Sequence, residues 1–316
     1  MSSGDAIESS GVVNGSAASG GDDKKDMIYP KTFSGVSFGE VNHFVNADGN
    51  YLFCRYWKPE KEIKALVFHV HGYAEHCGRS KELANKLMEI GVLSFAHDHY
   101  AHGESQGLRC HVMDYTILSR DIWQHIDLIR PGYPDLPIFL YGHSMGGGLS
   151  VLTAHERPNY FRGVLLSAPY ITPSPDTATP FKLFLARVII RVAPKLRIGK
   201  LKLEFLSRDQ KQIDNYVNDP LNDNDGMRAG FAMQFLAMSD KLKEILPSLD
   251  IPIFAAHSEA DGLCDIGGTK LLMEVCNSKD KTFKIYKDCM HMLEHETLEF
   301  VEEYFAEVLK WIKERI

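Results

Sequence analysis

The segment 142–146 reads Gly-His-Ser-Met-Gly and places one serine between two glycines. An apolar run, 138–141, precedes it, and further glycines follow it. A sharp turn between a strand and a helix requires glycine two residues before and after its central residue, because the two elements nearly touch there. We therefore predict that Ser144 is a nucleophile exposed on a strained turn. A plain glycine-rich turn is the alternative.

A serine hydroxyl attacks a carbonyl carbon efficiently only when an imidazole takes its proton and a carboxylate orients that imidazole. Where the nucleophile stands on a strand-to-helix turn, the acid and then the histidine follow the serine along the chain. Three acidic residues follow the apolar run 251–256, namely Glu259, Asp261 and Asp265. Asp261 stands at the usual position of such an acid and the other two flank it, so we predict that Asp261 orients the base.

The base is expected after the last strand. The run 283–286 is the last strand-like segment, and His291 follows it in a loop before an amphipathic stretch. His295 is a rival, but its place at the edge of the terminal helix favours a surface or capping role. We predict a catalytic triad of Ser144, Asp261 and His291.

A serine mechanism also needs N–H groups that stabilise negative charge on the carbonyl oxygen. A helix that begins at Met145 directs its first N–H groups and the positive end of its dipole towards that charge. The second donor comes from a loop after an early strand, which here is the segment 67–76, V-F-H-V-H-G-Y-A-E-H. We predict that the backbone N–H groups of Tyr73 and Met145 form the oxyanion hole.

The segment 97–103, H-D-H-Y-A-H-G, is dense in histidine and has to be compared with the H-x-H-x-D-H pattern of binuclear metal hydrolases. Alanine stands at position 101, where that pattern requires an aspartate. We predict instead a structural loop in which Asp98 caps backbone groups and Gly103 permits a tight turn, and we predict no metal site. The six cysteines lack paired spacing, which favours free thiols.

The elements that must position these residues alternate between apolar runs and amphipathic stretches. The segment 51–57 alternates in the manner of an antiparallel strand. Continuous apolar runs predict strands that are buried on both faces, at 65–70, 92–96, 138–141, 164–166, 253–256 and 283–286. Helical spacing of apolar residues predicts helices over 114–130, with Asp114 as N-cap, and over 301–312. We expect an α/β domain over 27–316, with a mostly parallel central sheet flanked by helices.

The alternation stops between 170 and 249, where helical segments punctuated by proline replace it. We expect an inserted helical cap there. Within it, the apolar segment 181–193 includes Lys182, Arg187 and Arg191 and is too short to cross a bilayer. This segment is either a cap helix packed on the core or a lid that touches membrane and substrate.

The composition is that of a globular protein, with 316 residues of which 44% are hydrophobic. A formal net charge of -7 argues against a nucleic-acid partner, which would need clustered Lys and Arg. Residues 1–26 are rich in Ser, Gly, Ala and Asp and predict a disordered tail. The sequence lacks a secretory signal and an apolar run of about 18 residues, so we expect a cytoplasmic location.

Four segments, in order along the chain, carry a resemblance to a known family. They are V-N-A-D-G-N-Y-L-F-C-R-Y-W-K-P at 45–59, F-A-H-D at 95–98, G-H-S-M-G-G at 142–147 and D-G-L-C-D at 261–265. With them the chain resembles the monoglyceride lipase family over about residues 30–315. The resemblance implies an α/β-hydrolase fold and hydrolysis of monoacylglycerols to fatty acid and glycerol through an acyl-enzyme, without a cofactor.

The same resemblance implies where a lipid would lie. The acyl chain would occupy an apolar tunnel beneath the cap, and the polar headgroup would meet Glu75, Arg79, His143 and Tyr216. Tyr73 is larger than the small residue usual at its position, which predicts a narrower headgroup site. The cap is expected to make peripheral contact with a membrane surface. The sequence does not indicate an oligomeric state.

Two other functions remain open at this point. A lysophospholipase or a broad-specificity carboxylesterase would use the same triad, and a basic phosphate pocket would favour the former. A ligand receptor built on the hydrolase fold would bind a lipid with little turnover. Reaction with a fluorophosphonate separates the enzymes from the receptor, because the reagent labels only a serine with an aligned base.

Overall fold

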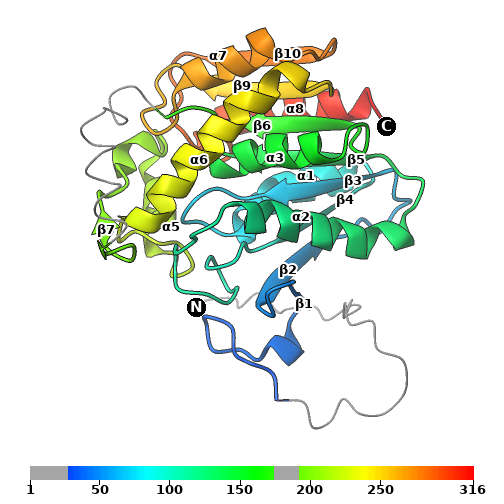
Figure 1. Cartoon of the computed structure of the whole chain (residues 1–316). Helices are drawn as coiled ribbons and strands as arrows, with labels where there is room; N and C mark the ends of the chain where they lie inside the picture. Colours follow the sequence, from blue (N-terminus) through cyan, green and yellow to red (C-terminus); the bar gives the residue numbers. More distant parts are fainter. Residues whose placement is uncertain (1–27, 174–191) are drawn as a thin grey trace.

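The computed structural model describes residues 28–173 and 192–316. Its centre is an eight-stranded sheet with the order β1-β2-β4-β3-β5-β6-β9-β10 (Figure 1). The pairs β1–β2 and β2–β4 are antiparallel, and all other neighbours are parallel. The strands are β1 (His43–Val45), β2 (Tyr51–Trp57), β3 (Ala65–Val70), β4 (Val92–His97), β5 (Ile138–His143), β6 (Gly163–Ser167), β9 (Ile253–Ser258) and β10 (Lys281–Tyr286).

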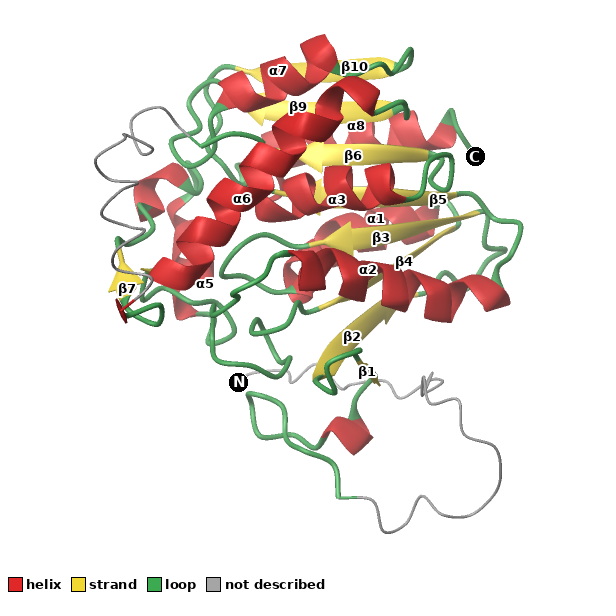
Figure 2. Ribbon diagram, in the orientation of Figure 1, coloured by secondary structure: helices red, strands yellow, loops and turns green. Residues whose placement is uncertain are grey.

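Helices cover both faces of this sheet (Figure 2). On one face pack α2 (Thr116–Ile129), α3 (Met145–Glu156), α6 (Ala229–Ile245) and α7 (Ile266–Val275). On the other face pack α1 (Lys81–Glu89) and α8 (Leu298–Lys313). The α/β-hydrolase architecture that the sequence predicts, a mostly parallel sheet between helical layers, is therefore confirmed.

The remaining elements are short and lie at the ends of the strands. A two-stranded sheet pairs β7 (Arg197–Ile198) with β8 (Met227–Arg228), and α5 (Gln210–Asn218) stands between them in the chain. Single turns of 3₁₀ helix occur at η2 (Phe38–Glu40), η3 (Cys77–Ser80), η4 (Arg130–Gly132), η5 (Leu203–Phe205), η6 (Leu246–Ser248) and η7 (Leu293–His295).

The continuous apolar runs became strands, and those inside the sheet are buried because both of its faces are covered. The expectation that 283–286 is buried on both faces is wrong, because β10 lies at the edge of the sheet and its residues are exposed or only partly buried. Every residue of β3, β4, β5, β6 and β9 is buried. The predicted helix over 114–130 begins at Thr116, and Asp114 is not its N-cap residue. The N-cap residue is Tyr115. The Asp114 carboxylate nevertheless accepts the Thr116 N–H at 2.9 Å, so it satisfies the first free backbone donor of α2.

The region between 170 and 249 carries α5, the β7–β8 pair and α6. The second half of α6 packs on the core, where Leu242 lies near Gly148 of α3. The predicted apolar segment 181–193 lies outside the described residues except for Val192 and Ala193. In the ranges 28–173 and 192–316, no helix is both long enough and apolar enough to cross a bilayer.

Candidate active site

Ser144 stands on the sharp turn between β5 and α3, with φ 54° and ψ -122°. This positive φ is rare for a residue with a side chain and indicates the strained turn that the sequence predicts. A Cβ added at Gly142 would lie 2.4 Å from the Gly146 carbonyl oxygen, and one at Gly146 would lie 2.0 Å from the Val70 carbonyl oxygen. The two glycines are therefore required because strand and helix touch there.

Asp261 follows β9 and His291 follows β10, and the structure brings the two together. His291 Nδ1 lies 2.7 Å from Asp261 Oδ2. Burial alone would raise the pKa of Asp261, but the charges and hydrogen bonds of His291 and His257 outweigh it and hold that pKa far below its usual range. Asp261 is thus an ionised carboxylate that fixes the imidazole ring of His291.

The rival residues lie elsewhere. Glu259 is exposed, and Asp265 caps α7 by accepting the Gly267 N–H at 2.9 Å. The expectation that His295 has a surface role is wrong. Its side chain is partly buried and lines a small cavity together with Arg79 and Glu75.

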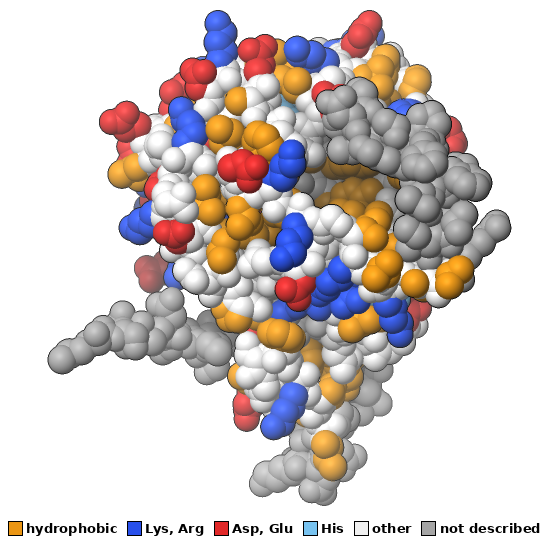
Figure 3. Space-filling view, turned by 90° about the vertical axis from the view of Figure 1, so that its left-hand side faces the viewer, with side chains coloured by type: hydrophobic (Ala, Val, Ile, Leu, Met, Phe, Trp, Pro, Cys, Tyr) orange, Lys and Arg blue, Asp and Glu red, His pale blue; other side chains and the backbone are white. Residues whose placement is uncertain are grey.

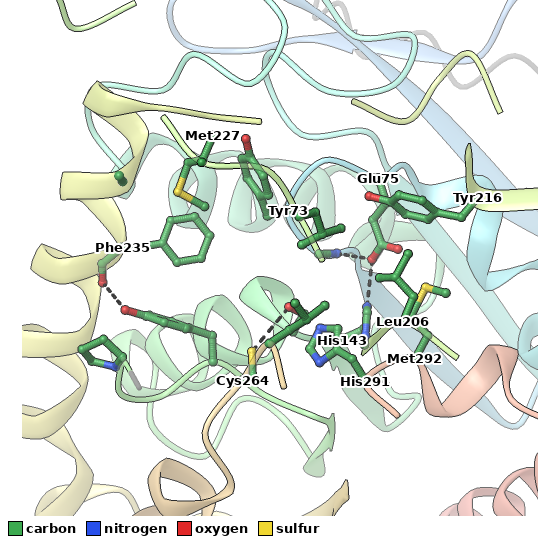
Figure 4. Close-up of a pocket in the computed structure, with 18 of the residues that line it drawn as sticks. Tyr73, Glu75, His143, Leu206, Tyr216, Met227, Phe235, Cys264, His291 and Met292 are labelled. Carbon is green, nitrogen blue, oxygen red and sulfur yellow. Dashed lines mark hydrogen bonds and ion pairs between the residues drawn. The ribbon is translucent and has the colours of Figure 1, made fainter. Parts of the chain in front are cut away.

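A cavity of about 570 Å³ meets Ser144 and His291. On the face of the molecule that carries α5 and β7, Figure 3 shows a hollow with hydrophobic lining. The wall is largely apolar and includes Tyr170, Leu206, Met227, Phe235 and Met292. Figure 4 shows Met227, Tyr73 and Phe235 on one side, and Glu75 and Tyr216 on the other. The cavity therefore has an apolar compartment along Met227 and Phe235 and a polar end at Glu75, beside which Leu206 and Met292 also lie.

Glu75 is the centre of the polar end. Its carboxylate accepts the Gly72 N–H at 2.6 Å, lies 2.9 Å from His143 Nδ1 and faces Arg79 Nε at 3.3 Å. Glu75, His143 and Tyr216 line the cavity, whereas Arg79 lies behind Glu75, with its guanidinium 5.1 Å from the Tyr216 ring centroid. Three of the four predicted headgroup residues thus reach the cavity.

His143 carries a charge at neutral pH. Burial alone would lower the pKa of His143, but the carboxylates of Glu294 and Glu75 outweigh it and raise the pKa to about 9. Its ring centroid lies 4.9 Å from that of His291. A buried imidazolium therefore neutralises Glu75 beside the serine.

Tyr73 lies in the loop that the sequence predicts. The His71 ring orients this loop, because Nε2 accepts the His99 N–H at 2.9 Å and Nδ1 donates to the Gly72 carbonyl oxygen at 2.8 Å. The carbonyl of Gly72 and the N–H of Tyr73 belong to one planar trans peptide unit and point in opposite directions. Among the residues that the structure describes, no acceptor meets the N–H of Tyr73 or of Met145. The bulk of Tyr73 lies on the apolar side, against Phe231 and Phe235 of α6, instead of the predicted headgroup side.

The histidine-rich loop after β4 contacts the loop that carries Tyr73, since His99 donates its N–H to the His71 ring. The Asp98 carboxylate accepts the N–H groups of Cys77 and Glu104, each at 2.8 Å, and Gly103 has a φ of 49°.

His125 of α2 packs beside His97, with the two ring centroids 5.4 Å apart. Burial lowers the pKa of His125 to about 3, so its imidazole is neutral in the folded protein.

Acid should destabilise the protein through such buried histidines. The unfolded chain protonates His125 with a pKa of about 6.5, whereas the folded protein resists protonation until about pH 3. Stability is therefore lost as the pH falls below about 6.5, by about 2 kcal/mol for this one group between pH 7 and pH 5. In His125→Gln, the fall in unfolding free energy between these pH values should be smaller by that amount, as measured by urea denaturation. An unchanged pH slope would contradict this prediction.

Cys264 stands three residues after Asp261 in the same loop, which predicts that it lies near the acid and the headgroup end, and its Sγ lies 3.8 Å from Ser144 Oγ. Sequence reasoning missed other residues of the site. His257 Nε2 lies 3.1 Å from Asp261 Oδ2. His257 precedes Asp261 by four residues in the same strand-loop segment, a spacing that could have suggested this contact. The apolar wall of Leu206 and Phe235 has no local signal, because these residues reach the site only through the tertiary fold.

Comparisons with known proteins agree with this geometry. Residues 61–298 match the model of a family described as serine aminopeptidase, S33. Human monoglyceride lipase is 43% identical over 285 residues, which cover 90% of this chain and 94% of the human protein. A monoglyceride lipase homologue of monkeypox virus is 36% identical over 276 residues, 87% of this chain and 99% of the viral one.

Solved structures agree as well. The crystal structure of a monoacylglycerol lipase from Paleococcus ferrophilus superposes with a TM-score of 0.75 and 27% identity, over 84% of this chain and 99% of that chain. A soluble variant of the Saccharomyces cerevisiae monoglyceride lipase, with a TM-score of 0.78, 23% identity and coverage of 87% and 95%, supports the fold alone. The strand-to-helix serine turn and the sequence identity lead to one assignment: this chain belongs to the monoglyceride lipase family of serine hydrolases.

Proposed function

We propose that the protein hydrolyses monoacylglycerols to fatty acid and glycerol, with Ser144, His291 and Asp261 as its catalytic triad. The observation that carries this proposal is the meeting of Ser144 and the Asp261–His291 pair at one cavity with an apolar compartment and a polar end. The relatives named monoglyceride lipase, among them the human protein, support the choice of substrate.

In this mechanism His291 takes the proton of Ser144 as the serine attacks the ester carbonyl. The Nδ1–H of His291 donates to Asp261, which leaves Nε2 as the acceptor for that proton. The N–H groups of Tyr73 and Met145 stabilise the oxyanion, since they have no other acceptor among the described residues. The protonated His291 then gives its proton to the glycerol oxygen as the ester C–O bond breaks and glycerol leaves. Water next attacks the acyl-enzyme while His291 takes its proton, and the fatty acid leaves as Ser144 regains that proton.

The two ends of the cavity suggest how the ester is oriented. The acyl chain would lie along Tyr73, Met227 and Phe235, where the wall is apolar. The glycerol hydroxyls would meet Glu75 and His143, which offer charged groups, and Tyr216. Arg79 would act on the headgroup only through Glu75, which separates it from the cavity.

The organisation of the chain is part of the proposal. Residues 1–26 would be a tail, 27–316 one hydrolase domain and about 170–249 its cap. Within this proposed cap, Val192 and Leu196 are exposed at 82% and 51% of their area. Arg228 donates to the carbonyl of Lys195, which places two cations beside these apolar residues. We propose a cytoplasmic protein whose cap contacts membrane surfaces peripherally.

A panel of esters tests the function. The purified full chain should hydrolyse long-chain monoacylglycerol faster than lysophosphatidylcholine, and a fluorophosphonate should label Ser144. Faster turnover of lysophosphatidylcholine would indicate a lysophospholipase. Lipid binding without turnover and without labelling would contradict enzymatic function and indicate a receptor.

Replacing Val192 and Leu196 by serine should weaken binding to anionic vesicles, because each exposed apolar side chain could bury its surface in the lipid interface, a gain of about 1.5–3 kcal/mol. Hydrolysis of vesicle-bound monoacylglycerol should slow, while a short soluble ester, which needs no extraction from lipid, is cleaved as before. Replacement of the exposed Ile285 on β10 by serine is the control. Equal vesicle binding by the control and the double variant would count against a membrane role of this surface.

A further inference from the structure

The loop that carries Tyr73 is held from the cap side by the segment 216–223. Ala74 in this loop has a φ of 62°, a left-handed conformation that residues with a Cβ rarely adopt. Its carbonyl oxygen accepts the Asp223 N–H at 2.9 Å and the Tyr216 hydroxyl at 3.4 Å. Two donors from the segment 216–223 thus hold Ala74, the residue after Tyr73, in its left-handed conformation.

The same segment also holds the end of the loop. His76 Nε2 lies 2.9 Å from Asp219 Oδ2, and its Nδ1 accepts the Gly78 N–H, so the ring proton stands on Nε2 and is donated to Asp219. The other oxygen of Asp219 accepts the Leu221 N–H at 2.9 Å. One carboxylate therefore joins the loop to the turn that follows α5.

The segment 216–223 is held in place by two arginines, so it can support the loop that carries Tyr73. Both oxygens of Asp223 pair with the Arg197 guanidinium, at 2.7 and 2.9 Å. The Arg109 guanidinium donates to the carbonyls of Leu221 and Gly103 at 3.1 and 2.8 Å. Because Arg197 belongs to β7, these bonds connect β7 with the segment 216–223, which in turn holds the loop.

We propose that the segment 216–223 is a clamp that sets the position of the oxyanion loop, with Asp219 and Asp223 as positioning residues. The proposal rests on the proposed function, because it concerns an ester whose oxyanion meets the Tyr73 N–H. That contact forms fully only in the transition state, so a displaced loop lowers kcat and leaves KM nearly unchanged. The loss is the same for long and short acyl chains, because the carbonyl is common to all of them.

Asp219→Ala in the full chain tests the clamp. Its kcat on a short soluble ester should fall about 10- to 100-fold, a part of the 10²- to 10³-fold loss that removal of one oxyanion donor causes, with KM within about twofold. An alkyl boronic acid, whose adduct with Ser144 sends an oxygen into the oxyanion hole, should bind more weakly by the same factor. Binding of a free fatty acid should not change. Asp225→Ala is the matched control, since this 80% exposed carboxylate of a nearby turn faces Arg197 at 3.6 Å and not the loop.

A double-mutant cycle adds a second readout. If His76 and Asp219 act through one contact, His76→Ala should show the same loss of kcat, and the double variant should lose no more than either single variant. His76→Ala also serves as the test if Asp219→Ala does not fold. Unchanged kcat and boronate affinity in a folded variant would overturn the clamp, and so would parallel losses of kcat, boronate binding and fatty-acid binding. A parent protein that cleaves no ester would refute the proposed function itself.

Discussion

Replacing Ser144 by alanine should lower kcat by about 10⁶-fold, the loss expected when the nucleophile of a triad is removed. The fold should survive, because the Ser144 hydroxyl makes one polar side-chain contact among the described residues, the Cys264 thiol at 3.8 Å. Alanine meets the positive φ at this position with the same Cβ that serine has. Activity on monoacylglycerol and on a short ester should fall together, while fatty-acid binding and the melting temperature stay near those of the parent protein.

A second serine close to Ser144 in the chain provides the control for this test. Ser150 lies on α3, the helix that follows Ser144, and its hydroxyl donates to the Gly146 carbonyl away from the cavity, so Ser150→Ala is a suitable control with nearly normal turnover. A Ser144→Ala protein that retains more than about one thousandth of the parent activity would show that another residue is the nucleophile.

The fold was predictable, and a triad could be proposed, because their signals are local. The glycines at 142 and 146 report a steric contact within one turn, and the apolar runs report burial on both faces of a sheet. Asp261 and His291 follow their strands in the order that this turn imposes. The elements β1, β7 and β8 were not predicted, because strands of two or three residues leave no periodic pattern.

The electrostatics of the site was not predictable, because it depends on residues far apart in the chain. His143 is charged only because Glu75 and Glu294, 68 and 151 residues away along the sequence, converge on it in the fold. The partial burial of His295 and the approach of Cys264 to Ser144 depend in the same way on tertiary packing. Sequence position suggested a surface or capping role for His295. It placed Cys264 near the acid and the headgroup end of the site, without indicating its contact with Ser144 itself.

The proposed clamp and the proposed triad would act on different quantities. In the proposed mechanism His291 and Asp261 decide whether the serine can lose its proton, whereas the oxyanion loop decides how well the resulting charge is stabilised. A defect in the triad therefore slows reaction with a fluorophosphonate as well as ester turnover. The two groups of variants can be compared on one substrate, with boronate affinity as the measure of the oxyanion hole.

The Asp261 carboxylate serves four donors, and this sets what an asparagine would do there. Oδ2 faces His291 Nδ1 and His257 Nε2, while Oδ1 accepts the N–H groups of Leu263 and Cys264 at 2.8 and 3.0 Å. An amide has one oxygen and one NH₂ group. If its oxygen faced the imidazoles, the NH₂ would oppose two buried backbone N–H groups. The less costly orientation keeps the oxygen on the backbone and turns the NH₂ towards His291.

Asp261→Asn should therefore lower kcat by about 10⁴-fold, because an NH₂ facing Nδ1 forces the His291 proton onto Nε2, the nitrogen that must accept the proton of Ser144. Since the serine and the oxyanion donors remain in place, KM for a short ester should change little. The matched control is Asp265→Asn, whose amide oxygen can still accept the Gly267 N–H at the start of α7. Steady-state kinetics of both variants at pH 7 to 8 provides the measurement. If Asp265→Asn lost more activity than Asp261→Asn, the acid of the triad would be Asp265, and the 2.7 Å contact of His291 with Asp261 would be structural.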